Sequence, residues 1–122
     1  MKLFIFILAL TLFLSGCGDS KEIKRVKSGS FKNCQNKTVE QAADDFFDSP
    51  KWESGIGVDG ETKGLPLVNL KGKMKIRGKE VDAVLQFILD ENGQSFKAHA
   101  LETNGVPQPD IVLIGLLKKM CE

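Results

Sequence analysis

The sequence predicts a single α+β domain: a four-stranded antiparallel meander with an N-terminal and a C-terminal helix packed on one face. Three observations support this prediction: an amphipathic helical stripe, a long run of alternating apolar and polar residues, and an apolar helical segment near the C-terminus. A chain of 122 residues has room for one domain. Its 17 basic and 16 acidic residues nearly balance, so it lacks the basic excess typical of nucleic-acid-binding proteins.

The first predicted helix begins after Thr38 and ends before Pro50. Thr38 and Gln41, three residues apart, form a capping-box pattern at its start. Apolar residues then recur at helical spacing, which places them on one stripe. These residues are Val39, Ala42, Ala43, Phe46 and Phe47.

Four strands are expected after this helix. A short strand is predicted over 51–57, and longer ones over 67–77, 80–90 and 94–102, where apolar and polar residues alternate. This period of two is typical of strands with one buried face.

Two turns set the expected strand pairing. Asn92-Gly93 is a strong two-residue hairpin signal, and Gly78-Lys79 is a weaker one. Pairing outward from these turns places apolar residues opposite apolar residues, which a one-residue slip would destroy. The expected pairs are Ile76 with Val81, Met74 with Ala83, Leu70 with Phe87, Leu89 with Phe96, Phe87 with Ala98, and Leu85 with Ala100.

The last predicted helix begins at Pro109, a residue favoured at the first helical position. Lys118 and Lys119 fall in its last turn, where cations interact favourably with the helix dipole. Residues 111–117 are apolar except for Gly115. Such a broad apolar surface predicts a helix that is buried on more than one side.

The first residues have the pattern of a secretory signal. An apolar run over 3–14 is shorter than the roughly 20 residues that a membrane-spanning helix needs. The following Leu14-Ser15-Gly16-Cys17 resembles the bacterial lipobox. This resemblance implies cleavage before Cys17, a thioether-linked lipid on that residue, and acylation of the new amino terminus. An uncleaved anchor and an ordinary signal peptide are the alternatives.

These features divide the chain into a lipoprotein signal peptide (1–16), a lipidated tether (17–30) and one folded domain (31–122). Between Lys21 and Lys37 the chain has six basic residues and one acid. We favour a solvated linker, and contact with anionic head groups is the alternative. Gly18 rather than Asp follows Cys17. By the sorting pattern of Gram-negative lipoproteins, this favours the outer membrane in such a host.

Cys34 and Cys121 remain, in a compartment that permits disulfides. A bridge between them would close a loop of nearly the whole domain and stabilise it by about 4–5 kcal/mol in chain-entropy models. Free thiols or a metal pair are the alternatives. The chain has one histidine, His99, and no Cys-x-x-Cys, which argues against a zinc site.

Residues 38–53 follow the pattern T-x-x-x-A-x-x-x-F-F-x-x-P-K-W-E. This pattern resembles that of a small extracytoplasmic domain found in bacterial lipoproteins and behind zinc-ribbon or membrane segments. The resemblance extends over about residues 26–121, and its motifs are mostly structural. The family is uncharacterised, so it implies no catalytic residue, and this chain has the lipobox in place of the zinc ribbon.

The face of the sheet turned away from the helices is the candidate interaction surface. Basic side chains there surround apolar ones, which suits an anionic, partly apolar partner such as a lipid head group or another envelope protein. A solvated sheet face is the alternative. His99 lacks a nucleophile or carboxylate that the register would place beside it, so we do not expect it to be catalytic. The residues are Lys71, Lys73, Lys97, His99, Val84, Ile88 and Leu101.

The predicted function is that of a membrane-anchored envelope lipoprotein acting as a non-enzymatic protein-interaction module, such as an accessory subunit, inhibitor or exclusion factor. The alternative is a small-ligand or lipid carrier, which needs a cavity between helices and sheet. Bulky side chains such as Trp52 and Phe87 argue that this space is filled. We expect no cofactor, metal or nucleic acid. The expected partners are the membrane, through the lipid anchor, and another envelope protein on the periplasmic side.

Overall fold

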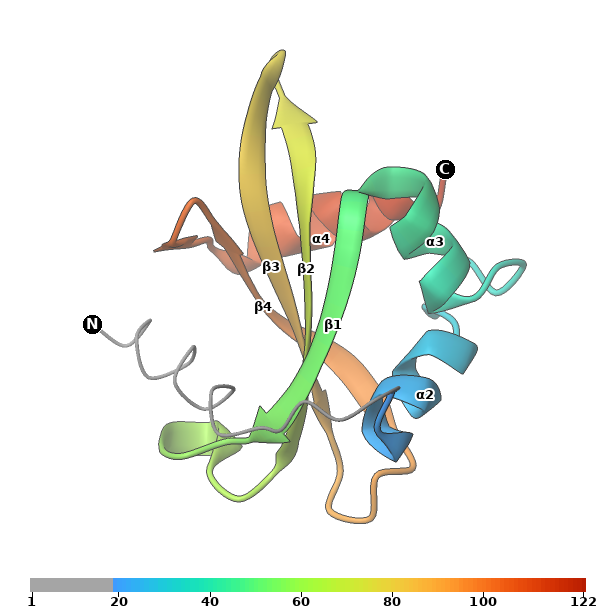
Figure 1. Ribbon diagram of the computed structural model, residues 1–122, viewed down its shortest axis with the longest axis vertical. Coiled ribbons are helices and arrows are strands. Elements are labelled where there is room, and N and C mark those ends of the chain that lie inside the picture. The colour runs from blue at the N-terminus through green and yellow to red at the C-terminus, as the bar shows by residue number, and fades with distance from the viewer. Residues whose placement is uncertain (1–18) are drawn as a thin grey trace.

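The computed structural model describes residues 19–122 and shows an α+β fold built on a five-stranded antiparallel sheet (Figure 1). The strands adjoin one another in chain order, so the sheet is a meander. Within this range the elements are α2 (Lys21–Ser28), α3 (Val39–Phe46), β1 (Asp48–Ile56), the 3₁₀ turn η1 (Gly60–Thr62), β2 (Pro66–Ile76), β3 (Lys79–Leu89), β4 (Phe96–Thr103), β5 (Val106–Pro107) and α4 (Asp110–Met120). The predicted α+β class and antiparallel meander are confirmed, with a third helix and a short fifth strand added. The predicted leader 1–16 and Cys17 lie outside the described residues.

The helices and the sheet share one hydrophobic core. In Figure 1, α2 and α3 lie beside β1, and α4 crosses behind the sheet. Residues from all three of these helices belong to the buried cluster. At its centre is Phe87, whose ring lies 6.2 Å from Phe31, 6.5 Å from Trp52 and 5.9 Å from Phe96, measured between centroids.

Helix α2 occupies most of the segment predicted to be a tether over 17–30, and this part of the prediction is wrong. The Ser20 side chain caps the helix by accepting a hydrogen bond from the Ile23 amide at 3.2 Å. Ile23 and Val26, three residues apart, are both buried in the core. Two apolar positions among lysines are a weak helical signal, yet they attach this segment firmly to the domain. The folded unit therefore begins well before residue 31.

Helix α3 begins as the sequence predicts, but it ends at Phe46 rather than just before Pro50, and β1 begins at Asp48 rather than at 51. The Thr38 hydroxyl accepts a hydrogen bond from the Gln41 amide at 3.1 Å, and the Gln41 side chain accepts one from the Thr38 amide at 2.8 Å. The capping residue Phe47, just after the helix, is buried against Gly72 of β2. A Cβ atom on Gly72 would lie 2.7 Å from the Phe47 Cβ. Glycine is therefore required where α3 meets the sheet.

The β2–β3 pairing differs from the predicted one by two residues. The turn consists of Arg77 and Gly78, both with positive φ (53° and 81°), as a type I′ turn requires. Met74 consequently lies opposite Val81 rather than Ala83, and Leu70 opposite Leu85 rather than Phe87. Because side chains alternate with a period of two, the shift leaves every residue on its predicted face.

The β3–β4 pairing follows the prediction only as far as Phe87 opposite Ala98. Beyond that pair the register shifts, and His99 becomes the extra residue of a β-bulge. Gln86 then pairs with Ala100, and Leu85 pairs with Leu101. The prediction of Leu101 on the outer face is therefore wrong, because the bulge turns this large apolar side chain into the core, where it is 1% exposed.

Cys34 and Cys121 lie at disulfide distance, with their Cα atoms 5.5 Å apart and a sequence separation of 87. This confirms the predicted pair. The bridge connects the segment before α3 to the end of α4, so it links the two ends of the core.

Helix α4 is buried along one stripe only. Leu113, Leu116 and Met120 face the core. Ile111 is 75% exposed and Ile114 is 54% exposed, so the prediction of burial on more than one side is wrong. Within residues 19–122, no helix is both long enough and apolar enough to cross a membrane.

Candidate functional site

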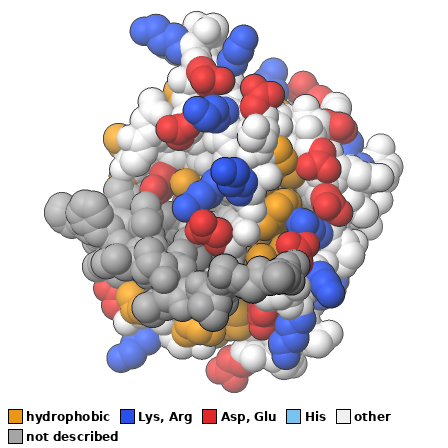
Figure 2. All heavy atoms as spheres, viewed as in Figure 1, with side chains coloured by type: hydrophobic (Ala, Val, Ile, Leu, Met, Phe, Trp, Pro, Cys, Tyr) orange, Lys and Arg blue, Asp and Glu red, His pale blue; other side chains and the backbone are white. Residues whose placement is uncertain are grey.

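The sheet face predicted to bind a partner keeps most of its predicted residues, but two of its lysines are paired with acidic residues. The Lys71 Nζ lies 3.1 Å from Glu53 Oε1 on β1. The Lys73 Nζ lies 3.7 Å from Asp82 Oδ1 on β3. Figure 2 likewise shows acidic and basic side chains interspersed on the side of the molecule that it presents. A surface with paired charges has less preference for an anionic partner than the sequence suggested.

The other residues predicted for this surface do not all lie on it. The alternation along β3 keeps Val84 and Ile88 on this face, both half-buried. Lys97 is exposed and pairs with Ile88 across the strands. Leu101 lies in the core and not on this face. The apolar centre of the surface is therefore smaller than predicted.

His99 sits in the bulge of β4 and faces the turn between β1 and β2. Its Nε2 lies 4.0 Å from the Glu61 carboxylate of η1. The sequence did not reveal this neighbour, because the position of a loop cannot be read from strand alternation. The Glu61 side chain is 81% exposed, so the pair is a weak surface interaction. A hydrolytic relay would also need a nucleophile bonded to the imidazole.

A row of buried polar side chains crosses the middle strands, and it was not predicted from the sequence. Asn69 on β2 lies opposite Gln86 on β3, and Glu102 on β4 lies opposite Val84. Asn69, Gln86 and Glu102 are each at most 3% exposed. In the described structure Asn69 Nδ2 and Oδ1, Gln86 Nε2 and Glu102 Oε2 have no hydrogen-bond partner.

Glu102 is the titratable member of this row. Burial raises the pKa of its carboxyl group to about 7, and the positive charge of Lys71 opposes that shift. A carboxyl group with this pKa exchanges its proton near neutral pH. Such groups are often functional, but they also occur in structural clusters. The other groups of the row are two amides, which supply neither a nucleophile nor a second base.

The outer stripe of α4 is exposed, although the sequence predicted that this helix is buried on more than one side. Ile111, Ile114 and Lys118 lie at helical spacing on the side opposite the buried stripe. Gly115 lies between them, and a Cβ atom there would meet nothing within 4 Å. Val106 of β5, just before the helix, is 56% exposed. Large apolar side chains that face the solvent along one side of a helix, as Ile111 and Ile114 do, are typical of binding surfaces.

No group of three or more His, Cys, Asp or Glu side chains that could hold a metal ion occurs within residues 19–122. Comparison with known proteins found no match to a protein-family model, to a curated protein or to a solved structure.

Proposed function

We propose that this chain is a lipid-anchored protein of the bacterial cell envelope that acts, without enzymatic activity, by binding another protein through the outer face of α4. The lipobox pattern ending at Cys17 supports the anchor. The exposure of Ile111 and Ile114 is the observation that supports the binding role. The periplasmic side of the outer membrane is the proposed location in a Gram-negative host, because Gly18 follows Cys17.

The fold itself does not require apolar residues on the outer stripe. Leu113, Leu116 and Met120 already hold α4 in the core. Isoleucines that face water contribute nothing to this packing and favour association with another apolar surface. Polar residues would serve equally well on this stripe if it faced only water.

The charges on α4 indicate the chemistry of the partner. Lys118 lies at the C-terminal end of the stripe and is exposed. Lys119 beside it is also exposed, with its Nζ 3.9 Å from Glu122 Oε1. An apolar protein segment flanked by acidic residues would match both the isoleucines and these lysines. The flat surface at Gly115 would let such a segment approach the helix backbone closely.

The alternative role as a small-ligand or lipid carrier has less support. A carrier of this architecture would hold its ligand between the helices and the sheet. The stacked and edge-on contacts of Phe87 with Phe31, Trp52 and Phe96 occupy the middle of that space. The interior therefore favours a packed core over a binding cavity.

Site-specific photocrosslinking in living cells tests the proposal. A photoreactive amino acid at position 114 should give a crosslink to a second envelope protein whose contacted peptide is apolar and carries acidic residues. The same amino acid at Val58, an exposed apolar position near η1, is the matched control and should not give that crosslink. The substitutions Lys118→Glu and Lys119→Glu should reduce it.

Three outcomes would overturn this function: equal crosslinking from positions 114 and 58, a contacted peptide without acidic residues, or a crosslink only to a second copy of this chain.

A further inference from the structure

The start of the folded domain lies immediately beside the residue proposed to carry the lipid. Asp19 is already ordered, with its carboxylate 2.6 Å from the Lys27 ammonium group. Ser20 is held by its hydroxyl, 3.0 Å from the Ser54 hydroxyl of β1. Two peptide units join Cys17 to Asp19 and span at most about 7 Å. The 14-residue tether expected from the sequence could have spanned ~45 Å between the lipid and the domain. Because α2 is part of the folded domain, most of this possible distance is lost.

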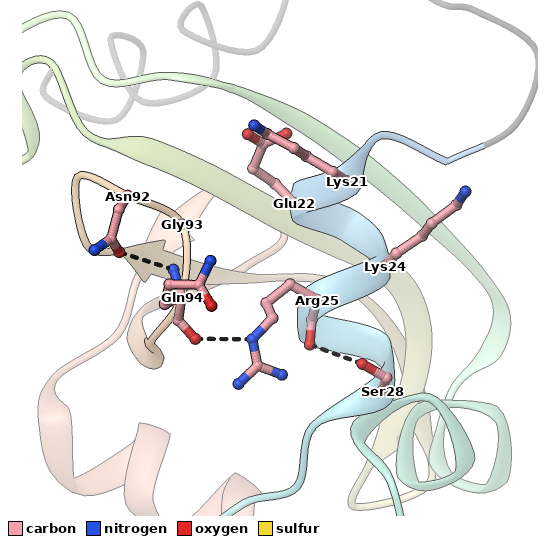
Figure 3. A pocket seen from close by; sticks show the side chains of 8 residues that line it. All are labelled: Lys21, Glu22, Lys24, Arg25, Ser28, Asn92, Gly93 and Gln94. Atoms are coloured by element: carbon pink, nitrogen blue, oxygen red, sulfur yellow. Dashed lines mark hydrogen bonds between the residues drawn. The ribbon is translucent and has the colours of Figure 1, made fainter.

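The surface beside this point is a basic hollow between α2 and the β3–β4 turn. A cavity of about 320 Å³ lies there, lined by one face of the helix and by Asn92, Gly93 and Gln94 of the turn (Figure 3). Lys21, Lys24 and Arg25 contribute three positive charges to its rim, against the single acid Glu22. Among the described residues, none of these three cations has a carboxylate within ion-pair distance. They differ in this from Lys71 and Lys73 of the sheet face.

Arg25 is held in place while most of its guanidinium group stays available. Its Nε donates a hydrogen bond to the Gln94 carbonyl at 2.8 Å. Its Cζ lies 5.8 Å from the centre of the Phe96 ring. Figure 3 shows the two terminal nitrogens directed away from that carbonyl. A guanidinium group fixed in this way is well suited to pair with a phosphate, because little side-chain entropy remains to be lost.

We infer that this end of the domain, formed by α2 and the β3–β4 turn, docks on the anionic phospholipid head groups of the membrane that holds the lipid. The inference rests on the proposed anchor at Cys17. The short connection keeps this end of the domain near the bilayer. Three cations that have no carboxylate partner among residues 19–122 match the negative charge found there. The β2–β3 turn then points away from the membrane, since it lies at the opposite end of the molecule from α2 and the β3–β4 turn (Figure 1).

Energy transfer to a labelled membrane measures this orientation directly. Cys34 and Cys121 are bonded to each other and Cys17 would carry the thioether, so one introduced cysteine is the only free thiol. The lipidated protein is labelled with a fluorophore through Gln94→Cys in the β3–β4 turn or Arg77→Cys in the β2–β3 turn. It is then reconstituted into vesicles that carry an acceptor dye on some head groups. The 11 residues of β3 separate the two turns by about 35 Å.

On vesicles containing phosphatidylglycerol, transfer from position 94 should be several-fold greater than transfer from position 77. On vesicles of phosphatidylcholine alone, the difference between the two positions should be clearly smaller, because only the short connection then keeps this end near the bilayer. The double variant Lys21→Glu/Lys24→Glu should lower the ratio of docked to undocked domains by at least about 30-fold, because two basic residues are lost near an anionic surface and the new carboxylates are repelled by it. The matched control, Lys75→Glu/Lys79→Glu, changes the same charge at the far turn and should leave the ratio unchanged.

Equal transfer from positions 94 and 77, or the same preference on both kinds of vesicle, would overturn the docking. Mass spectrometry of the purified protein tests the anchor separately. An acylated Cys17 with equal transfer would reject the docking alone, whereas an unmodified Cys17 would reject the anchor and the docking together.

Discussion

Leu85 lies opposite Leu101 in the β3–β4 pair, one residue further along β4 than the Asn92-Gly93 turn alone would place it. The bulge at His99 produces this offset. The residues of β4 that follow it therefore face the opposite side of the sheet from the one that regular alternation would give them. Leu101 enters the core, while Glu102 joins Asn69 and Gln86 on the other face. One extra residue thus creates both a core contact and the buried polar row.

The position of Leu101 predicts a large loss of stability on truncation. Leu101→Ala should lower the free energy of unfolding by roughly 2–5 kcal/mol, because it leaves a cavity in the core. Ile88→Ala, on the outer face of β3, should cost clearly less, since Ile88 is only half-buried. Urea unfolding of both variants provides the comparison. Similar losses for the two would place Leu101 outside the core.

The extra residue itself should be dispensable. Removing His99 would let Ala98, Ala100 and Leu101 follow one another with the alternation of a regular strand, and each would keep its present partner on β3. The deletion variant should therefore fold with Leu101 still buried. Its backbone nuclear Overhauser contacts between β3 and β4 provide the measurement. Loss of the Leu85–Leu101 contact in a folded deletion variant would contradict this account of the bulge.

These corrections show which features a local pattern can predict. Helix α3 was predictable because its capping box and its stripe both lie within a dozen residues. The faces of β2 and β3 were predictable from alternation, but the register was not, because Arg77 adopts a positive φ that its side chain does not favour. The bulge at His99 depends on contacts with the rest of the core. The polar row follows from that bulge, so the sequence could not reveal it.

Helices α2 and α4 also show that a local pattern does not predict how much of a helix is buried. α2 presents only Ile23 and Val26 to the core, which is too few positions for a clear helical period. α4 has more apolar residues than the core can cover, so composition alone suggested a more deeply buried helix. The burial of each helix depends on how much apolar surface the rest of the domain presents to it. That amount cannot be derived from the sequence of the helix itself.

Gly72 and Gly115 should respond oppositely to the same substitution. Gly72→Ala places a Cβ atom 2.7 Å from Phe47 Cβ and should cost roughly 1–3 kcal/mol through overpacking. Gly115→Ala meets nothing within 4 Å and should stabilise α4 by up to about 1 kcal/mol, because alanine is the better helix former. Thermal unfolding by circular dichroism distinguishes them. Destabilisation by Gly115→Ala would mean that this face is already covered in the protein.

Glu102 should make the domain less stable as the pH rises. Its pKa is about 7 in the folded protein and lies near 4.3 in an unfolded chain. Between these values the folded state binds more protons, so stability is fully present below the lower pKa and falls as the pH rises through the upper one. The expected loss between pH 4.5 and 7.5 is roughly 1–3 kcal/mol.

The Glu102→Gln variant keeps the shape of the side chain and removes its titration. Its free energy of unfolding should therefore fall by clearly less than that of the parent over this pH range. Glu80→Gln, at an exposed position of β3, still contains Glu102 and should lose as much stability as the parent. A pH dependence in Glu102→Gln equal to that of the Glu80→Gln control would show that Glu102 titrates normally.

The disulfide should account for a large share of the total stability. Cys34 and Cys121 are 87 residues apart, and a loop of this size corresponds to about 4–5 kcal/mol in the chain-entropy description. The double variant Cys34→Ser/Cys121→Ser should unfold at a much lower urea concentration than the parent. Reductant should destabilise the parent and leave the double variant unchanged. An equal response of the two proteins to reductant would exclude the bridge.

The inclusion of α2 in the core gives the last prediction. Val26 is fully buried, so Val26→Ala should cost roughly 1–3 kcal/mol in the free energy of unfolding. Lys24→Ala lies on the exposed side of the same helix and should change stability by less than about 0.5 kcal/mol. If residues 17–30 were a solvated tether, both variants would unfold like the parent. Amide hydrogen exchange adds an independent measurement, because the amide that donates within the last turn of α2, from Gly29 to the Val26 carbonyl at 3.1 Å, would be protected only if the helix is part of the fold.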